Sequence, residues 1–294
     1  MGSRFMPCMR CLPLWPRKYL QDWIPSKCDC QLLRSLLRRK SYPTLQGLYL
    51  GSNAGPWGKE GNFNEHGGCF SKVVRIGAHF AVKIPEGLPA EVACPLMCGG
   101  GTVFESLTDY ASVGTKVGVI GIGGLGTSAI RLAKIKGASV TAISRSPKKE
   151  KGCYDEGVND FLLSTDEAKM AEYQGKFDLL LDCTPVNTDL KPWMELLKFD
   201  GTYCRVGIPS ADDAEFKYDF ITAITQQKKI SGSIIIGTAR MNLLLDIVAA
   251  NQDLFKNTDE TFTQIIPFSK VNEAMDALQQ NKVECYRTIL AWDA

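Results

Sequence analysis

Residues 116–126 read Lys-Val-Gly-Val-Ile-Gly-Ile-Gly-Gly-Leu-Gly, and this stretch decides the fold. A short apolar segment leads directly into the pattern G-x-G-x-x-G, formed by Gly121, Gly123 and Gly126, and apolar residues at helical spacing follow over 127–136. The pattern predicts a strand, a tight turn and a helix. In such a unit the turn and the helix N-terminus offer backbone N–H groups to a phosphate.

The three motif glycines have separate physical roles. Gly121 permits the tight turn, Gly123 lets the backbone approach a pyrophosphate, and Gly126 lets the helix pack on its strand. The pattern alone is a weak signal, but residues 138–143 read as the next parallel strand and complete a β-α-β unit. We therefore predict a dinucleotide site. Its residues in the turn are Gly121, Ile122, Gly123, Gly124, Leu125 and Gly126.

The residues after the second strand indicate which dinucleotide is bound. An NAD site places Asp or Glu about 20 residues beyond the glycines, whereas this chain has Ser-Arg-Ser-Pro-Lys-Lys at 144–149. No carboxylate is there to repel a 2′-phosphate, and hydroxyl, guanidinium and ammonium groups can bind one. The pattern favours NADP(H), with a phosphate pocket formed by Ser144, Arg145, Ser146, Lys148 and Lys149. The alternative is an ordinary solvated basic loop.

The composition is that of a globular protein. The chain has 294 residues, 45% of them hydrophobic and 22% charged, which is enough for two modest domains. The net charge of +2 gives no support for a nucleic-acid partner, and no apolar run is long enough for a membrane helix. The eleven cysteines are scattered, and no secretory signal is evident. Both observations favour reduced thiols and a cytoplasmic location.

Residues 1–62 differ in character from the rest of the chain. Basic residues outnumber acidic ones there, and prolines interrupt any long element. Cys8 and Cys11 have a spacing that suits zinc, but Cys28 and Cys30 are too close together to complete the usual site. We predict an atypical, poorly ordered segment with unpaired thiols. A structural zinc, a nucleic-acid arm and a transit peptide are the alternatives.

From residue 67 onward, apolar segments typical of strands alternate with helical segments. This alternation predicts an α/β fold with a doubly wound parallel sheet. Beyond the first unit, the predicted strands cover 67–74, 80–85, 160–163, 177–183, 201–207, 229–237 and 285–292. The predicted helices cover 89–96, 102–111, 167–173, 190–198, 218–227, 241–250 and 271–281, with a glycine-rich break at 98–101.

From about residue 67 to the C-terminus the chain resembles the medium-chain dehydrogenase/reductases. Within that superfamily it is most similar to the NADP-dependent, cinnamyl-alcohol-dehydrogenase-like zinc alcohol dehydrogenases. The motifs that carry the resemblance, besides the glycine turn, are Gly67-Gly68-x-x-Ser71, His79-Phe80-x-Val82-x-Ile84-Pro85-x-Gly87-Leu88, Pro95-Leu96-x-Cys98-x-Gly100-x-Thr102-Val103, Asp182-Cys183-Thr184-Pro185-Val186, Gly201-x-x-x-x-x-Gly207, Ser231-Gly232-Ser233-Ile234 and Tyr286-Arg287.

The resemblance implies a subunit of two domains. One is a Rossmann NADP-binding domain at 99–236, and the other is an incomplete GroES-like, mainly-β catalytic domain at 63–98 and 237–294. Hydride then passes between the nicotinamide and an aldehyde polarised by zinc. The resemblance makes Cys98 a zinc ligand and Thr102 a catalytic and cofactor-binding residue beside the nicotinamide. Further cofactor contacts that it implies are Thr184, Val206, Gly207, Ser233 and Arg287.

The chain departs from this family in its zinc ligands. A catalytic zinc needs three protein ligands and one open position, but the family's upstream Cys followed by Ser/Thr-Asp and its Gly-His-Glu motif are both absent. The only histidines are His66 and His79, and the structural zinc lobe of four spaced cysteines is missing. Ligands besides Cys98 are therefore not identifiable, and we expect a shortened or altered gene product.

Three functional hypotheses follow. The first is an NADP(H)-dependent alcohol dehydrogenase or aldehyde reductase for aromatic or aliphatic aldehydes, active or impaired by the missing ligands. The second is a zinc-independent quinone or enone reductase of the same superfamily, and the third is a non-catalytic NADP-binding remnant. The resemblance also implies a homodimer joined near the strand at 229–237, where Ile230 and Ile234 suit a sheet edge.

Overall fold

The computed structural model describes residues 81–209, 215, 219–255, 263–280 and 287–292. The chain divides into two compact units, and all of these residues lie in the second, which comprises Phe70–Val73 and Ala81–Ala294. The predictions for residues 1–62 and for a strand at 67–74 fall outside the described residues.

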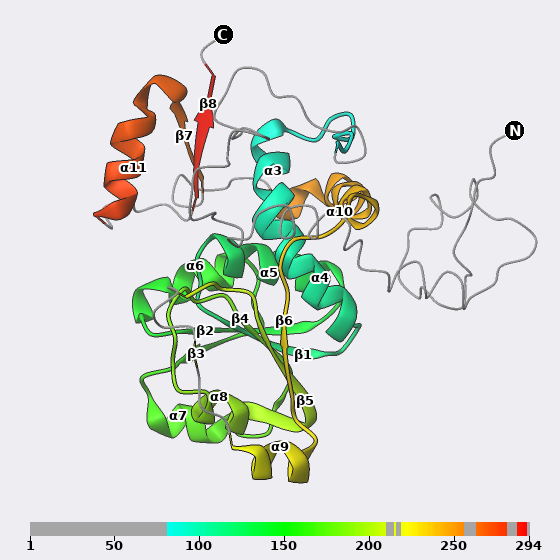
Figure 1. The fold of residues 1–294 in the computed structure, drawn as a ribbon, viewed down its shortest axis with the longest axis vertical. Helices are drawn as coiled ribbons and strands as arrows, with labels where there is room; N and C mark the ends of the chain where they lie inside the picture. The colour runs from blue at the N-terminus through cyan, green and yellow to red at the C-terminus, as the bar shows by residue number, and fades with distance from the viewer. Residues whose placement is uncertain (1–80, 210–214, 216–218, 256–262, 281–286, 293–294) are drawn as a thin grey trace, which may run out of the picture. The chain divides into compact units, whose positions relative to one another are not determined.

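A six-stranded parallel sheet forms the centre of this unit (Figure 1). Its strands lie in the order β3-β2-β1-β4-β5-β6, so the order reverses between β1 and β4. The strands are β1 (Lys116–Ile120), β2 (Ser139–Ser144), β3 (Asp160–Leu163), β4 (Phe177–Asp182), β5 (Leu197–Arg205) and β6 (Lys229–Gly232). This doubly wound order confirms the predicted α/β Rossmann fold.

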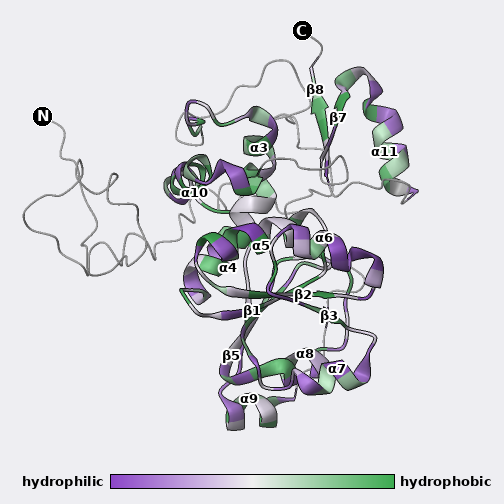
Figure 2. Cartoon of the chain, turned by 180° about the vertical axis from the view of Figure 1, so that it is seen from behind, coloured by the Kyte–Doolittle hydropathy of each residue, from purple (hydrophilic) through white to green (hydrophobic). Residues whose placement is uncertain are grey.

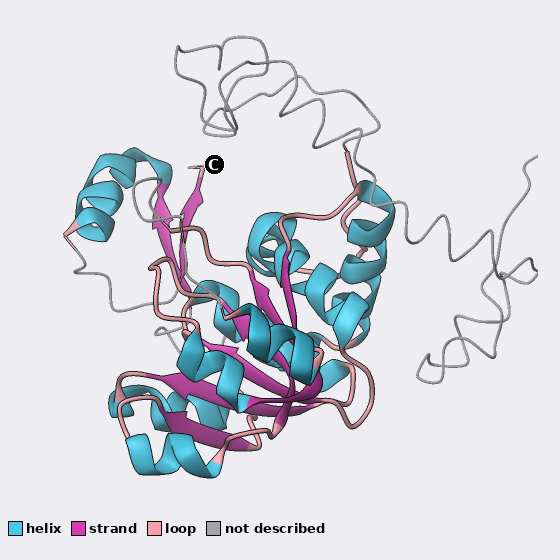
Figure 3. Ribbon diagram, turned by 60° about the horizontal axis from the view of Figure 1, so that its bottom comes forward, coloured by secondary structure: helices cyan, strands magenta, loops and turns pink. Residues whose placement is uncertain are grey.

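Helices cover both faces of the sheet. Figure 1 shows α4, α5 and α6 on one face and α7, α8 and α9 on the other, and Figure 3 shows the helices and the sheet from another direction. The α-helices are α3 (Ala90–Pro95), α4 (Gly101–Tyr110), α5 (Gly124–Ile135), α6 (Glu150–Asp155), α7 (Glu167–Glu172), α8 (Lys191–Leu196), α9 (Phe220–Gln226), α10 (Thr238–Ala250) and α11 (Val271–Gln279). None of the helices in the described part of the chain has both the length and the apolar character needed to cross a bilayer.

Shorter elements complete the described unit. A separate two-stranded parallel sheet pairs β7 (Thr263–Pro267) with β8 (Arg287–Ala291). The π-helix η6 (Leu96–Gly100) joins α3 to α4, and the 3₁₀ helices are η7 (Pro147–Lys149), η9 (Gln252–Phe255) and η10 (Phe268–Lys270). Neither the strand β7 nor the helix α6 was predicted from the sequence.

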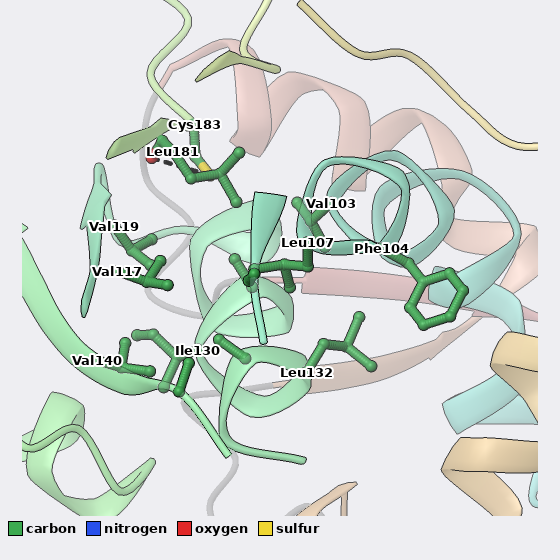
Figure 4. Packing of buried hydrophobic residues seen from close by; sticks show 14 of the residues in the cluster. Val103, Phe104, Leu107, Val117, Val119, Ile130, Leu132, Val140, Leu181 and Cys183 are labelled. Carbon is green, nitrogen blue, oxygen red and sulfur yellow. Dashed lines mark hydrogen bonds between the residues drawn. The ribbon is translucent and has the colours of Figure 1, made fainter. Parts of the chain in front are cut away.

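The central strands are apolar because both of their faces are buried. Val117 and Val119 of β1 pack with Leu107 of α4 and Ile130 of α5 in the larger hydrophobic cluster (Figure 4). Ile120 belongs to a second cluster, which includes residues of β2, β4 and α8. In Figure 2 the helices carry hydrophilic and hydrophobic residues together, as expected when one face of each helix packs on the core.

The glycine-rich break predicted at 98–101 is wrong. The chain stays helical over residues 90–110, and η6 is the only departure from α-helical geometry in that stretch. An ideal Cβ at Gly101 would lie 3.0 Å from side-chain atoms of both Ile236 and Met241. The glycines here allow close packing against a distant part of the chain, and they do not interrupt the helix.

Two predicted strands also differ from the structure. Residues 81–85 form no strand, because no described strand lies beside them to exchange backbone hydrogen bonds. β6 ends at Gly232, five positions short of the prediction at Gly237. The reason is that the N–H of Ile235 donates to Oγ1 of Thr102 (3.0 Å), and Ile235 has a left-handed backbone with φ of 39°. The backbone there turns away from the sheet.

Candidate functional site

Four strands of the sheet end together at one edge. Ile120 of β1 pairs with Ile143 of β2 and with Asp182 of β4, and Asp182 pairs with Arg205 of β5. Because these residues close their strands or stand next to the end, the loops that follow them meet at one edge. The strand order reverses at this place, and open α/β sheets bind their ligands at such a reversal.

The glycine turn after β1 is shaped by close backbone contacts. Gly121 has φ of 83°, which glycine adopts readily, and its N–H donates to the carbonyl of Ile143 (3.0 Å). An ideal Cβ at Gly121 would lie 2.6 Å from Cγ2 of Thr184, and one at Gly126 would collide with the carbonyl oxygen of Gly121. No described atom lies within 4 Å of an ideal Cβ at Gly123. Gly123 therefore leaves room for a ligand.

Helix α5 begins at this turn, and no side-chain hydrogen bond caps it among the described residues. The hydroxyls of Thr127 and Ser128 donate to main-chain carbonyls one turn earlier, at 2.9 Å each. Ile122 and Leu125 pack their side chains against the core, so their backbones are what they offer to a ligand. The uncapped N–H groups and the helix dipole favour an anion, and the open space at Gly123 fits a pyrophosphate.

The loop after β2 is shaped by local hydrogen bonds. Ser144, the last residue of β2, is buried, and its Oγ accepts a hydrogen bond from the N–H of Ser146 (3.2 Å). Arg145, between them, is exposed. The loop presents hydroxyl and guanidinium groups with no carboxylate among residues 144–149, as the sequence predicts for a phosphate site.

Lys149 joins this basic loop to the glycine turn. Its Nζ donates to the carbonyl oxygen of Ile122 at 2.5 Å. Burial lowers the pKa of Lys149; the Cys153 side chain opposes this shift, and the Arg145 charge adds to it. The structure thus places Lys149, one of the predicted 2′-phosphate residues, in contact with the predicted pyrophosphate turn.

Arg287 of β8 places a cation at the N-terminus of α5. An ideal Cβ at Gly124, the first residue of α5, would lie 2.6 Å from Nη2 of Arg287, and one at Gly99 would lie 2.9 Å from it. Burial lowers the pKa of Arg287, and the nearby Cys98 and Cys94 oppose this shift. A guanidinium at this end of the helix adds to the positive potential of the helix dipole, and this favours an anion.

The loops after β4 and β5 pack against each other beside the glycine turn. The N–H and Oγ1 of Thr184 donate to Oδ1 of Asp182, at 2.8 and 2.7 Å. The N–H groups of Val206 and Gly207 donate to the carbonyl of Asp182, at 2.9 and 3.0 Å. A Cβ at Gly207 would collide with the carbonyl oxygen of Thr184. The three predicted contacts after these strands therefore lie at the same edge.

Hydrogen bonds join Thr102 to Cys98 and to Ser233. Oγ1 of Thr102 donates to the carbonyl of Cys98 (3.0 Å) and accepts from the N–H of Ile235 (3.0 Å). Oγ of Ser233 donates to the carbonyl of Thr102 (3.2 Å). The hydroxyl of Thr102 is buried and already hydrogen-bonded, so its contact with a nicotinamide stays a prediction.

Zinc finds no complete donor set among the residues that the structure describes. Cys98 and Cys94 are exposed thiols one helical turn apart, but no group of three or more His, Cys, Asp or Glu side chains there could hold a metal ion. His66 and His79 lie outside the described residues. The described residues therefore do not fit a catalytic zinc by themselves, and the ligand role of Cys98 stays a prediction.

Sequence reasoning missed a buried polar cluster beneath this edge. It is formed by Asp182, Tyr203 and Arg205, with the Tyr203 hydroxyl donating to Oδ2 of Asp182. One signal was present in the sequence, since Asp182 is a charged residue that closes an otherwise apolar strand. Its partners could not be named from the sequence, because they depend on the register between β4 and β5.

A glycine turn at the reversal of a parallel sheet defines the class of dinucleotide-binding α/β proteins. Comparison with known proteins narrows this class. Residues 124–250 match the family model described as zinc-binding dehydrogenase. Mannitol dehydrogenase of Apium graveolens is 33% identical over 228 residues, which are 76% of this chain and 60% of that protein. NADP-dependent alcohol dehydrogenase C 1 of Mycolicibacterium smegmatis is 31% identical over 226 residues, which are 76% and 62% of the two chains.

Solved structures agree with these relatives. A cinnamyl alcohol dehydrogenase from Sorghum bicolor superposes with a TM-score of 0.65 at 30% identity, covering 74% of this chain and 59% of that chain. These matches support a zinc-binding dehydrogenase domain at 124–250 with alcohol dehydrogenase relatives, which confirms the resemblance drawn from the motifs. It spans about three fifths of the length of the curated relatives that it matches.

Proposed function

We propose that this chain binds NADP(H) and acts as an oxidoreductase that interconverts a small aldehyde and its alcohol. The observation that carries the proposal is the open, uncapped glycine turn at Gly123, which lies next to a basic loop anchored on it by Lys149. The names of the relatives, an NADP-dependent alcohol dehydrogenase among them, support it. Aromatic aldehydes are the proposed substrate class, because the Sorghum bicolor structure is named for cinnamyl alcohol.

The chain's own residues divide the work of holding the cofactor. We assign the pyrophosphate to the Gly121–Gly126 turn, the start of α5 and Arg287, and the 2′-phosphate to the 144–149 loop. Thr184 and Gly207, after β4 and β5, then lie on the nicotinamide side. NADPH, when bound, supplies the hydride. The protein's contribution is to bind and orient the dinucleotide. The positive charges of the 144–149 loop favour NADP(H) over NAD(H), because only NADP(H) carries a 2′-phosphate.

No step of the proposed chemistry is assigned to zinc, since the described residues hold no complete donor set. Zinc binding that involves Cys98, the division at 99–236 into a Rossmann domain with GroES-like flanks, and the cytoplasmic location stay proposals. The deciding experiment measures NADPH oxidation at 340 nm with cinnamaldehyde and with a quinone, alongside the zinc content of the purified protein.

The three hypotheses give different results in this experiment. Turnover of cinnamaldehyde supports the alcohol dehydrogenase proposal. Turnover of the quinone alone, by protein without zinc, would replace it with the zinc-independent reductase. Saturable NADPH binding without turnover of either acceptor would replace it with a non-catalytic nucleotide-binding protein.

Replacing Arg145 with aspartate tests the cofactor preference. We expect Arg145→Asp to raise the Kd for NADPH by about 10- to 100-fold, because a charge-assisted hydrogen bond to the 2′-phosphate is lost and a like charge is introduced. The Kd for NADH should not rise. Lys151→Asp, which makes the same change of charge at an exposed residue of α6, is the control. If Arg145→Asp and the unaltered protein bind NADPH with equal affinity, the 144–149 loop is an ordinary solvated loop and not a phosphate site.

We also propose that the chain forms a homodimer through the edge of the sheet at β6. This strand has a single partner, β5, among the described strands, so one side of its backbone offers hydrogen bonds to a second copy. Ile230 and Ile234 are exposed there, and Phe220, Ile221 and Ile224 of the neighbouring α9 are about three quarters exposed. The edge thus combines open backbone with apolar side chains.

A charge placed on the β6 edge should separate the copies. We expect Ile230→Lys to shift the protein from dimer to monomer in analytical ultracentrifugation, because lysine on an edge strand opposes pairing. Tyr154→Lys, at an exposed residue of α6, is the control and should stay dimeric. A dimer that survives Ile230→Lys at the same protein concentration would place the contact elsewhere.

A further inference from the structure

A fully buried carboxylate lies at the end of β4, where the strand enters its loop. Asp182 accepts hydrogen bonds from the N–H of Thr184 at 2.8 Å, from Oγ1 of Thr184 at 2.7 Å, and from the hydroxyl of Tyr203. Nη1 of Arg205 lies 3.6 Å from its second oxygen. A buried charge is costly unless it is paired and hydrogen-bonded, and this one has both kinds of partner.

Arg205 extends the cluster into the loops on both sides. Its Nε donates to the carbonyl of Gly207 at 3.1 Å, in the loop after β5. Its Nη2 donates to the carbonyl of Val186 at 2.7 Å, in the loop after β4. One guanidinium therefore holds two loops to the same carboxylate, with the planar set of donors that lysine lacks.

Tyr203 stays a hydrogen-bond donor at neutral pH. Burial raises the pKa of its hydroxyl, the Asp182 charge raises it further, and Arg205 opposes this. The protonated phenol is fixed on the carboxylate, and its ring is almost completely buried in the core. The buried ring thus fixes the hydroxyl on Asp182, and Arg205 connects Asp182 to the two loops.

The two loops fixed by this cluster lie on the nicotinamide side of the proposed site. Adenosine is held beyond β2 and the pyrophosphate beyond β1, so the other half of a dinucleotide extends past the reversal, over β4 and β5. Thr184 fits between Gly121 and Gly207, and a Cβ at either glycine would strike it. A shift of Thr184 would therefore change the shape of the site beside Gly121 and Gly207, away from the 144–149 loop that is assigned to the adenosine half.

We infer that Asp182, Tyr203 and Arg205 form a positioning network that shapes the nicotinamide half of the dinucleotide site. The inference rests on the proposed NADP(H) binding and goes beyond it, because it assigns a role to residues that do not touch the cofactor. The network fixes the loops after β4 and β5 in the conformation that receives the nicotinamide and its ribose, and it leaves the adenosine half unchanged.

The test compares the whole cofactor with its adenosine half. Tyr203→Phe removes one donor to Asp182 and keeps the buried ring. We expect its Kd for NADPH to rise by about 5- to 20-fold, and its Kd for adenosine 2′,5′-bisphosphate to stay within about twofold, both measured by isothermal titration calorimetry. A general loss of folding would weaken the binding of both ligands together. A change in the Kd for NADPH alone therefore indicates that the loops on the nicotinamide side have moved.

The control is Tyr173→Phe, the same exchange at a second tyrosine whose hydroxyl donates to a carboxylate, that of Asp160 at the start of β3. It should leave both affinities unchanged. Should Tyr203→Phe fail to fold, Arg205→Lys serves instead, because it keeps a cation beside Asp182 and loses the forked contacts to the two loops. It should show the same difference between the two ligands.

Equal changes in the two affinities, or no change in either, would overturn the positioning role. This failure differs from a failure of the proposed function. If the unaltered protein binds neither NADPH nor adenosine 2′,5′-bisphosphate, the proposed NADP(H) binding is wrong, and the role of the network is overturned with it.

Discussion

Replacing Gly123 with valine is expected to weaken NADPH binding by about 100-fold or more, with the fold preserved. Gly123 has an extended backbone, with φ of −139° and ψ of −158°, close to the edge of the β region that valine adopts. No described atom lies within 4 Å of the added Cβ. The new side chain therefore occupies the space assigned to the pyrophosphate. Calorimetric titration with NADPH measures the loss.

The stability of the Gly123→Val protein separates blocked binding from misfolding. Valine is a poorer N-cap than glycine, so we expect a cost of about 1 kcal/mol and a fall in Tm of about 2–4 °C. Gly152→Val is the matched control, since an ideal Cβ at Gly152 in α6 also meets open space. If the Gly123→Val protein binds NADPH as tightly as the unaltered protein does, the pyrophosphate does not bind at this turn.

Replacing Arg287 with methionine is expected to raise the Kd for NADPH by about 10- to 100-fold, because a charge-assisted contact to the pyrophosphate is lost. The unliganded protein should keep its Tm within about 2 °C, because removal of a cation from the positive end of α5 offsets the lost contacts of the side chain. Titrations with NADPH and thermal melts without it measure the two effects.

Salt and a conservative variant sharpen the Arg287 prediction. NADPH affinity of the unaltered protein should fall with added salt more steeply than that of Arg287→Met, since one charge has been removed from the site. Arg287→Lys keeps the charge without the planar donors, and should give an intermediate affinity. If Arg287→Met binds NADPH as well as the unaltered protein does, the arginine has only a packing role against Gly99 and Gly124.

The sheet could be predicted because its signals are local. Residues 116–126 join an apolar strand, a glycine turn and a helix, and the later apolar runs are short and separated by helices. Buried parallel strands need such runs on both faces, so the order of elements follows from the pattern. The glycines at 98–101 failed as a signal, since whether glycine breaks a helix or allows close packing depends on Ile236 and Met241, far along the chain.

The candidate site could be predicted only in part, for a similar reason. The glycine turn and the 144–149 loop carry their chemistry in consecutive residues, and the structure brings them together through Lys149. The cluster at Asp182 depends on register, because Tyr203 pairs with Leu180 and Arg205 with Asp182 across two strands. No spacing along the chain encodes that register, so the cluster can be found only once the pairing of β4 with β5 is known.

Ile235 has a consequence for any experiment on Thr102. A β-branched residue with a left-handed backbone costs on the order of 1–3 kcal/mol, and such a conformation persists only where its surroundings hold it. Here the Thr102 hydroxyl accepts the hydrogen bond from the N–H of Ile235. A variant without that hydroxyl would lose the hydrogen bond that joins α4 to the segment after β6, and the backbone at Ile235 could then relax. Loss of activity in Thr102→Ala would thus measure backbone relaxation as well as lost chemistry, and Thr102→Ser, which keeps the hydroxyl, separates the two.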